Sequence, residues 1–426
     1  MKNYRRHPII EYVTAFALVF MMVIVPCAHY VCLIAQVSGR WISNLLTSGS
    51  VACAMCVVTS AAGRDLMPAD GVDKALAAVA VAVLVCIGCS PFPTSALYGD
   101  GRLEGGVMLF CYMVYFLTGR NISGLKSEKI VLAGFVAVAS AHCVYGLAQY
   151  FDLSEKVFDS YHTAISGVAG NPNFMGSLTV MALGITAGMA LFSKGFVAKI
   201  IYGAMAVLAG ITLLLTKSLS ACVGAVAVAA VLAGALVYRV YLIKGKKTAA
   251  LATVVCAVAG IIAIVCADMA TGGMIKTEIS ALLTAVQTGQ RDESVASGRL
   301  VIWQGCLQLA KENLLTGVGI GNLMDPFYEA FGLVNSQFVD RAHNELLNIL
   351  VTMGLPAFTA YVALYAGIFC KGMKKIKANP HNPQAIALMA AFVGYMAQGM
   401  FNISVIDVAP YFWILAGLLA QKTTDM

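Results

Sequence analysis

Two side chains with distinct chemistry stand in the longest polar stretch of an otherwise apolar chain. They are Arg299, in Ser297-Gly298-Arg299, and His343, in Ala342-His343-Asn344-Glu345. An arginine guanidinium is permanently charged and can hold two phosphate oxygens at once. A histidine at a water–lipid boundary can accept a proton near neutral pH. The pair suits a charged, lipid-linked substrate.

Each of the two residues also has a structural interpretation. Arg299 can pair with Asp292 or Glu293 and solvate a loop, and His343 can be an interfacial residue without a chemical role. The residue types alone leave both interpretations open.

Further charged residues fall near the ends of apolar runs. Lys217 stands between two such runs, where ionisable groups tend to be functional. Arg341 gives a second cation close to His343. Arg102 and Glu104 give another polar pair in a glycine-rich segment. We expect all of these groups on one side of a membrane.

Asparagines form the remaining candidates. Asn171 and Asn173 flank Pro172, which fits the first turn of a helix, so they can cap that helix or bind sugar hydroxyls. Asn344 follows the candidate histidine at the start of the next apolar run. No second histidine lies nearby in the sequence, and we expect no metal and no other cofactor.

The composition predicts membrane helices that position these groups. Of 426 residues, 60% are hydrophobic and 12% are charged. Apolar runs of roughly 20 residues recur, which is the length needed to cross a bilayer as helix. We therefore predict an all-α, polytopic bundle of about 12 transmembrane helices, forming one membrane domain over residues 1–426. The predicted spans are 10–35, 41–61, 75–91, 107–119, 130–150, 173–193, 197–215, 219–243, 249–268, 343–370, 384–405 and 408–421.

The distribution of charge predicts the orientation. With the N-terminus inside, most of the 28 basic residues fall in cytoplasmic segments, as the positive-inside rule requires. The net charge of +7 is then a signal of topology, and we expect a lipid bilayer and no nucleic acid as partner. Both termini are expected in the cytoplasm, and the candidate residues on the external face.

The longest polar stretch, 269–342, is predicted as a large external loop between the ninth and tenth spans. Within it, 297–314 carries apolar residues at helical spacing, with Ser297 as a cap and the glycine run 317–322 at its end. A twelve-span facilitator places its long loop in the cytoplasm, between the sixth and seventh spans. The predicted loop position therefore argues against a sugar transporter or flippase of that class.

Five motifs follow one another in a characteristic order. They are Gly170-Asn171-Pro172-Asn173-Phe174, Leu215-Thr216-Lys217-Ser218, Ser297-Gly298-Arg299-Leu300-Val301-Ile302-Trp303, Gly317-Val318-Gly319 and Ala342-His343-Asn344-Glu345-Leu346-Leu347. Over roughly residues 90–420, this order resembles the O-antigen ligase family and the related polysaccharide polymerases of bacterial envelopes.

The resemblance implies a function, a location and roles for residues. Members move a glycan from undecaprenyl diphosphate to an acceptor hydroxyl at the outer face of the bacterial inner membrane, with inversion and without a metal. It implies that Arg299 and His343 are catalytic, and that the acceptor is a glycan or a lipid. The family often has an arginine after the serine of the second motif, where this chain has Leu219 after Ser218.

We further expect a division of labour among the candidates. The diphosphate would be bound by Arg299, Lys217 and Arg341. The acceptor or sugar would be bound by Asn171, Asn173, Asn344, Arg102 and Glu104. A repeat-unit polymerase with the same donor is the alternative within this chemistry. A polysaccharide or lipid transporter is the alternative of another class, and it predicts polar residues deep within the spans.

Overall fold

The structure is a computed structural model that describes residues 8–34, 44–51, 53–54, 70–99, 101–122, 124–153, 164–288 and 298–421. Over these residues the chain is helical and contains no strand, which confirms the all-α prediction. The helices are α1 (Pro8–Ile34), α3 (Gly71–Cys89), α4 (Pro93–Tyr98), α5 (Gly106–Arg120), α6 (Leu125–Tyr150), α7 (Pro172–Phe192), α8 (Phe196–Leu215), α9 (Leu219–Ala270), α10 (Met274–Thr288), α11 (Arg299–Glu312), α12 (Met324–Phe331), α13 (Glu345–Ala378), α14 (Pro383–Gly399) and α15 (Ala409–Leu419).

Six helices in the described part of the chain are long and apolar enough to cross a membrane, namely α3, α6, α7, α8, α9 and α13. Shorter apolar helical stretches occur in α1 and α15. Helix α9 runs through both predicted spans 219–243 and 249–268, with a break at Gly245, where φ is 81°. A multi-pass membrane protein is confirmed, whereas the predicted number of spans and the predicted loop position stay predictions.

Small residues let the central helices approach each other closely. A side chain at Gly184 of α7 would lie 2.6 Å from the backbone of Ala391 in α14. A side chain at Gly119 of α5 would lie 2.6 Å from the Ile414 carbonyl in α15. Helices surrounded by lipid associate through this kind of close packing. The α7–α14 and α5–α15 pairs therefore form a rigid centre on which the candidate site is built.

A buried arginine ties helix ends together at one end of the bundle. Arg120 is 2% exposed and binds Asp70 at 2.7 Å, Asp73 at 3.1 Å and the Ala420 carbonyl. Lys371 also reaches Asp70, at 2.8 Å. The network joins α3, α5, α13 and the end of α15. It satisfies a buried charge with several partners, which is the condition for burying one.

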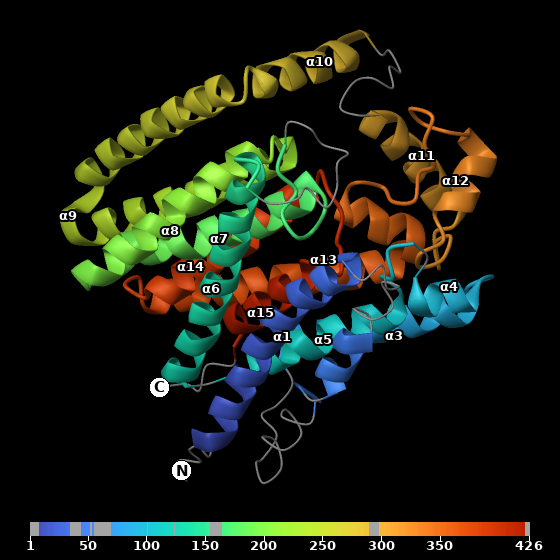
Figure 1. Ribbon diagram of the computed structural model, residues 1–426, viewed down its shortest axis with the longest axis horizontal. Coiled ribbons are helices and arrows are strands. Elements are labelled where there is room, and N and C mark those ends of the chain that lie inside the picture. Colours follow the sequence, from blue (N-terminus) through green and yellow to red (C-terminus); the bar gives the residue numbers. More distant parts are fainter. Residues whose placement is uncertain are drawn as a thin grey trace.

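The opposite end of the bundle carries α11, α12 and the start of α13, and we call it the site end (Figure 1). Here α13 is interrupted at Gly354, where φ is 77°. The interruption leaves carbonyls without helical partners, and Val351 and Thr352 accept hydrogen bonds from Val318 and Gly319 at 2.9 and 3.0 Å. The predicted span 343–370 is therefore a broken helix, and the break anchors the segment that follows α11.

Candidate functional site

The site end brings together segments that are far apart in the sequence. Helix α11 packs on the first turns of α13, and the 101–105 segment, the start of α7, the α8–α9 turn and the 400–405 segment lie at the same end (Figure 1). These segments, together with residues 340–344 that lead into α13, carry the candidate site residues. The fold thus brings to one end of the bundle candidate residues that are separated by more than half of the sequence length.

His343 sits at the junction that leads into α13, in a strained backbone conformation. Its φ of 48° is uncommon for a residue other than glycine. The flanking backbone is tied down on both sides, because the Trp303 indole donates to the Ala342 carbonyl at 3.0 Å and the Asn348 amide oxygen accepts from the Ala342 N–H at 3.2 Å. Asn344 caps α13 by accepting from Leu347 N–H at 3.0 Å. Such over-determined strain is typical of functional sites.

The surroundings of His343 are cationic. Arg102 forms a two-pronged ion pair with Asp340, at 2.5 and 3.1 Å. Burial, together with the positive charges of Arg299 and Arg102, lowers the pKa of His343 to about 4. Burial would raise the pKa of Asp340, but its bond to Arg102 and the neighbouring positive charges hold it below the ordinary value. At neutral pH the cluster therefore contains two guanidiniums, one carboxylate and an uncharged imidazole, and its net charge is positive.

Glu104 and Arg341 form a second, buried ion pair, two residues after Arg102 and one residue after Asp340 in the sequence. Their side chains are 3% and 8% exposed, and they lie 3.7 Å apart. Glu104 Oε1 also accepts from the Tyr112 hydroxyl at 3.0 Å and the Ser404 hydroxyl at 2.7 Å. Arg102 and Glu104 therefore do not face each other. Leu103, with φ of 56°, turns the chain so that one points to the surface cluster and the other inward.

Arg299 is the first residue of α11. The preceding Gly298 adopts a left-handed conformation, with φ of 76°, and has no side chain with which to cap the helix. The predicted cap Ser297 and the possible partners Asp292 and Glu293 lie outside the described residues. The helix ends at Glu312, before the predicted end at 314, so the glycine run does not cap it. That run packs instead on the break in α13.

The start of α7 and the α8–α9 turn form the other flank of the site end. Asn171 caps α7 by accepting from the Asn173 N–H at 2.8 Å, so the capping interpretation holds for it. The Ser218 hydroxyl donates to Asn173 Oδ1 at 2.7 Å. Lys217 is exposed and strained, with φ of 50°. No ion pair connects it to the His343 cluster among the described contacts.

The segment that follows α14 links both flanks, and sequence reasoning missed it. Asn402 donates to the Asn173 carbonyl at 3.1 Å, and the Phe401 ring lies 5.8 Å from that of Trp303. Two residues later, the Ser404 hydroxyl binds Glu104 and its N–H donates to Glu345 at 2.9 Å. The signal was present, because Asn402 and Ser404 interrupt the apolar pattern near the end of the predicted span 384–405.

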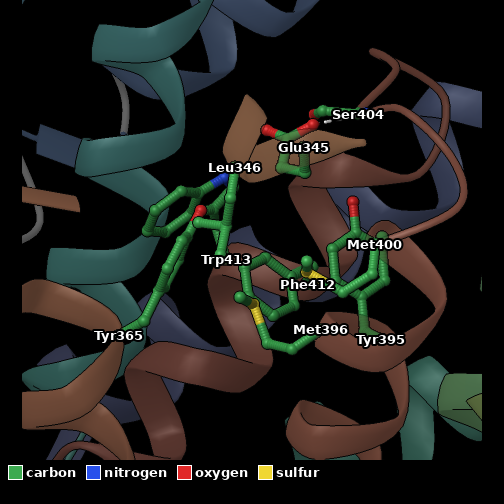
Figure 2. Close-up of a pocket in the computed structure, with 10 residues that line it drawn as sticks. Glu345, Leu346, Tyr365, Tyr395, Met396, Met400, Ser404, Phe412 and Trp413 are labelled. Atoms are coloured by element: carbon green, nitrogen blue, oxygen red, sulfur yellow. Dashed lines mark hydrogen bonds between the residues drawn. The ribbon is translucent and has the colours of Figure 1, made fainter. Parts of the chain in front are cut away.

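A narrow pocket opens between α13, α14 and α15 beneath this segment (Figure 2). Its polar side consists of Glu345 and Ser404. The rest of its lining is aromatic and apolar: Leu346, Tyr365, Tyr395, Met396, Met400, Phe412 and Trp413. The aromatic rings are tightly packed, with 4.2 Å between the centroids of Tyr395 and Phe412. The pocket therefore adds an apolar recess beside the charged cluster.

The arrangement defines a class: a multi-pass helical membrane protein with a cationic, histidine-containing cluster at one end of its bundle. Among the described residues, no three His, Cys, Asp or Glu side chains converge to form a metal site. The family model described as O-Antigen ligase matches residues 204–362, which include Arg299 and His343. Over this part of the chain, which is less than half of its length, the protein is therefore similar to the O-antigen ligase family, a family of glycosyltransferase-like enzymes, as the order of the five sequence motifs predicts. No curated protein matches the chain.

Proposed function

We propose that this protein transfers a glycan from undecaprenyl diphosphate to an acceptor hydroxyl at the external face of the bacterial inner membrane. The observation that supports it best is the convergence of Arg299, Arg102 and His343 at one end of a membrane bundle. A diphosphate linked to a membrane-embedded lipid lies at the bilayer surface, at the height where helices end. Cations at that height suit it, and the family match makes a lipid-linked glycan the natural substrate.

On the donor side, Arg299 is proposed as the principal diphosphate ligand. It stands in the first turn of α11, where free backbone N–H groups and the helix dipole add to its positive charge. We propose Arg102 as the second cation. Asp340 takes one edge of its guanidinium, so the other edge remains available for a phosphate oxygen. Both charges stabilise the diphosphate that leaves as the glycosidic bond breaks.

On the acceptor side, His343 is proposed as the base. Its lowered pKa keeps the imidazole neutral at physiological pH, so that it can accept a hydrogen bond from the acceptor hydroxyl. The hydroxyl oxygen attacks the anomeric carbon from the side opposite the diphosphate, and its proton passes to the imidazole. In-line displacement of this kind inverts the anomeric centre and requires no metal.

Among the remaining candidates, we propose that some bind the substrates and that others only support the site. Lys217, on the α8–α9 turn, is proposed to bind the outer phosphate or the first sugar, and Asn173 and Asn344 to bind sugar or acceptor hydroxyls. Arg341 is buried against Glu104, so we propose that this pair holds the site together and does not contact the diphosphate. The twelve-span topology, the single membrane domain with an external loop over 269–342, and cytoplasmic termini belong to the same proposal.

The test is glycan transfer in proteoliposomes that contain an undecaprenyl-diphosphate-linked glycan and a range of acceptors, with products resolved by size. His343→Ala and Arg299→Ala are expected to abolish transfer. Lys311→Ala, which removes an exposed cation from the same helix as Arg299, is expected to keep it. Full activity of well-inserted His343→Ala protein would refute the mechanism. A ladder of products would identify a polymerase, and a single added block a ligase.

A further inference from the structure

Helix α12 presents apolar side chains that the described part of the protein covers only in part. Met324, Tyr328 and Phe331 are 39%, 48% and 37% exposed. Their spacing of four and then three residues places them on one stripe of the helix. Leu323 and Phe327, by contrast, are fully buried against the protein. The exposed stripe therefore lies next to the buried side of the helix, about a quarter of a turn around its axis.

The exposed stripe continues into the segment that follows α12. Phe338 is 56% exposed, and its ring lies 4.9 Å from that of Tyr328. Leu333 is 41% exposed. These five residues, Met324, Tyr328, Phe331, Leu333 and Phe338, form what we call the α12 apolar face. Asp325 and Glu329 lie on a third side of the same helix, which is exposed and acidic.

A hydrogen bond sets the position of α12 relative to the bilayer. Asn322, just before the helix, donates to the Ser90 hydroxyl at 3.2 Å, and both side chains are buried. Ser90 is the residue at which the membrane-crossing helix α3 ends. Exposed residues in the last turns of α3, such as Leu84 and Val85, mark its lipid-facing side. Helix α12 therefore begins where a membrane span ends, which is the level of the lipid headgroups.

We infer that α12 lies in the surface of the bilayer, with the α12 apolar face inserted among lipid headgroups and upper acyl chains. Aromatic residues are enriched at this depth, because their rings are apolar and tolerate nearby water. The acidic third side is then turned to water, as in other helices that lie along an interface. The bond from Asn322 to Ser90 places the start of α12 at the end of the candidate span α3, which favours lipid over a second copy of the chain as the occupant.

The insertion has a consequence for the site. Helix α12 packs directly on α11, since a side chain at Gly305 would lie 2.6 Å from the Phe327 ring. A helix fixed at the bilayer surface therefore also fixes the depth of α11 and of Arg299 at its start. If the proposed function is correct, this keeps the cation level with a lipid-linked diphosphate. The insertion itself does not depend on that function.

Fluorescence quenching by lipids brominated at defined depths of their acyl chains tests the inference. Tyr328→Trp on the α12 apolar face is compared with Glu329→Trp on the acidic side, after subtraction of the signal from the natural tryptophans. We expect the added fluorescence at position 328 to be quenched at least about threefold more than at 329, and most strongly by the shallowest bromines. Phe331→Trp serves as a second probe if Tyr328→Trp does not fold.

Two outcomes would overturn the inference. One is equal or absent quenching at positions 328 and 329 in well-folded protein. The other is an emission at 328 that responds to the protein-to-lipid ratio and not to bromine, because that would show a second copy of the chain on the face. The measurement involves no glycan transfer, so its result is independent of the test of the proposed function.

Discussion

The buried pair of Glu104 and Arg341 offers a sharp test of how the site is held together. Its charges lie 3.7 Å apart, with side chains 3% and 8% exposed. At that separation and an effective dielectric constant of 20, the attraction is about 4 kcal/mol, and loss of one partner from a buried pair typically costs about 3–5 kcal/mol. The two carboxylate oxygens of Glu104 have different partners: Oε1 accepts hydrogen bonds from the Tyr112 and Ser404 hydroxyls, and Oε2 faces Arg341.

Glu104→Gln keeps the oxygen that Tyr112 and Ser404 use, but turns an amide group toward Arg341. We expect it to lower the free energy of unfolding by about 3 kcal/mol, and Arg341→Met to cost a similar amount. The double variant removes both charges of the pair, so it should recover about 2 kcal/mol or more of the summed loss. The measurement is reversible unfolding in mixed detergent micelles, with the four proteins forming a double-mutant cycle.

The Arg102–Asp340 pair is the matched control, because its side chains are 32% and 38% exposed. For a pair that water reaches, we expect a coupling of about 1 kcal/mol or less, which falls as salt is added. The reasoning would be refuted if the Glu104–Arg341 coupling were no larger than that of this control. It would also fail if Glu104→Gln left stability unchanged.

Three further predictions follow from the geometry. First, the pKa of His343 in the free enzyme is about 4, and only its neutral form accepts a proton. The value of kcat/KM for the donor, which reports on the free enzyme, should therefore persist as pH falls to about 5 and decline below it. A decline centred near pH 6.5 would contradict the lowered pKa. Second, Arg102→Gln removes a cation that lowers this pKa, so the acid limb of the pH profile should move to higher pH. An unmoved limb would show that Arg102 does not act on His343. Third, Gly354→Ala would place a side chain 2.5 Å from the Leu315 carbonyl, at a position where φ is 77°. This substitution should lower the free energy of unfolding by at least about 2 kcal/mol. The control is Gly260→Ala, which adds a side chain in open space on α9 and should cost nothing measurable.

The helices were predictable because lipid imposes a minimum length on apolar runs. The predicted spans 173–193 and 197–215 differ by only one residue at their edges from α7 and α8. The break at Gly245 within α9 falls in the short basic segment that separates the predicted spans 219–243 and 249–268, so the sequence located this break correctly. The break in α13 is marked in the sequence by Gly354 and Pro356, two residue types that disrupt helices. The mean hydropathy of the predicted span 343–370 does not reveal the break, because the residues around it are apolar.

The candidate site was predictable only in its separate parts. Arg299 and His343 could be named because charged groups are rare in this chain. Their surroundings could not, since Arg102 finds Asp340 across 238 positions of sequence. The sequence placed Arg102 and Glu104 on one side of the membrane, but it could not show that each would bind a different partner. Leu103 lies between them with a positive φ, and no periodicity in the sequence predicts its conformation.

Within the proposed function, placing the base beside the cations has an energetic logic. In the free site, burial and two guanidiniums make protonation of His343 unfavourable, so the imidazole is neutral but a weak base. A bound diphosphate brings about two negative charges to the same guanidiniums and reverses the sign of the local field, which raises the proton affinity of the imidazole. Binding of the donor would thus strengthen the base before the acceptor hydroxyl has to lose its proton. A histidine remote from the diphosphate would lack this coupling, and it would be equally basic in the presence and absence of donor.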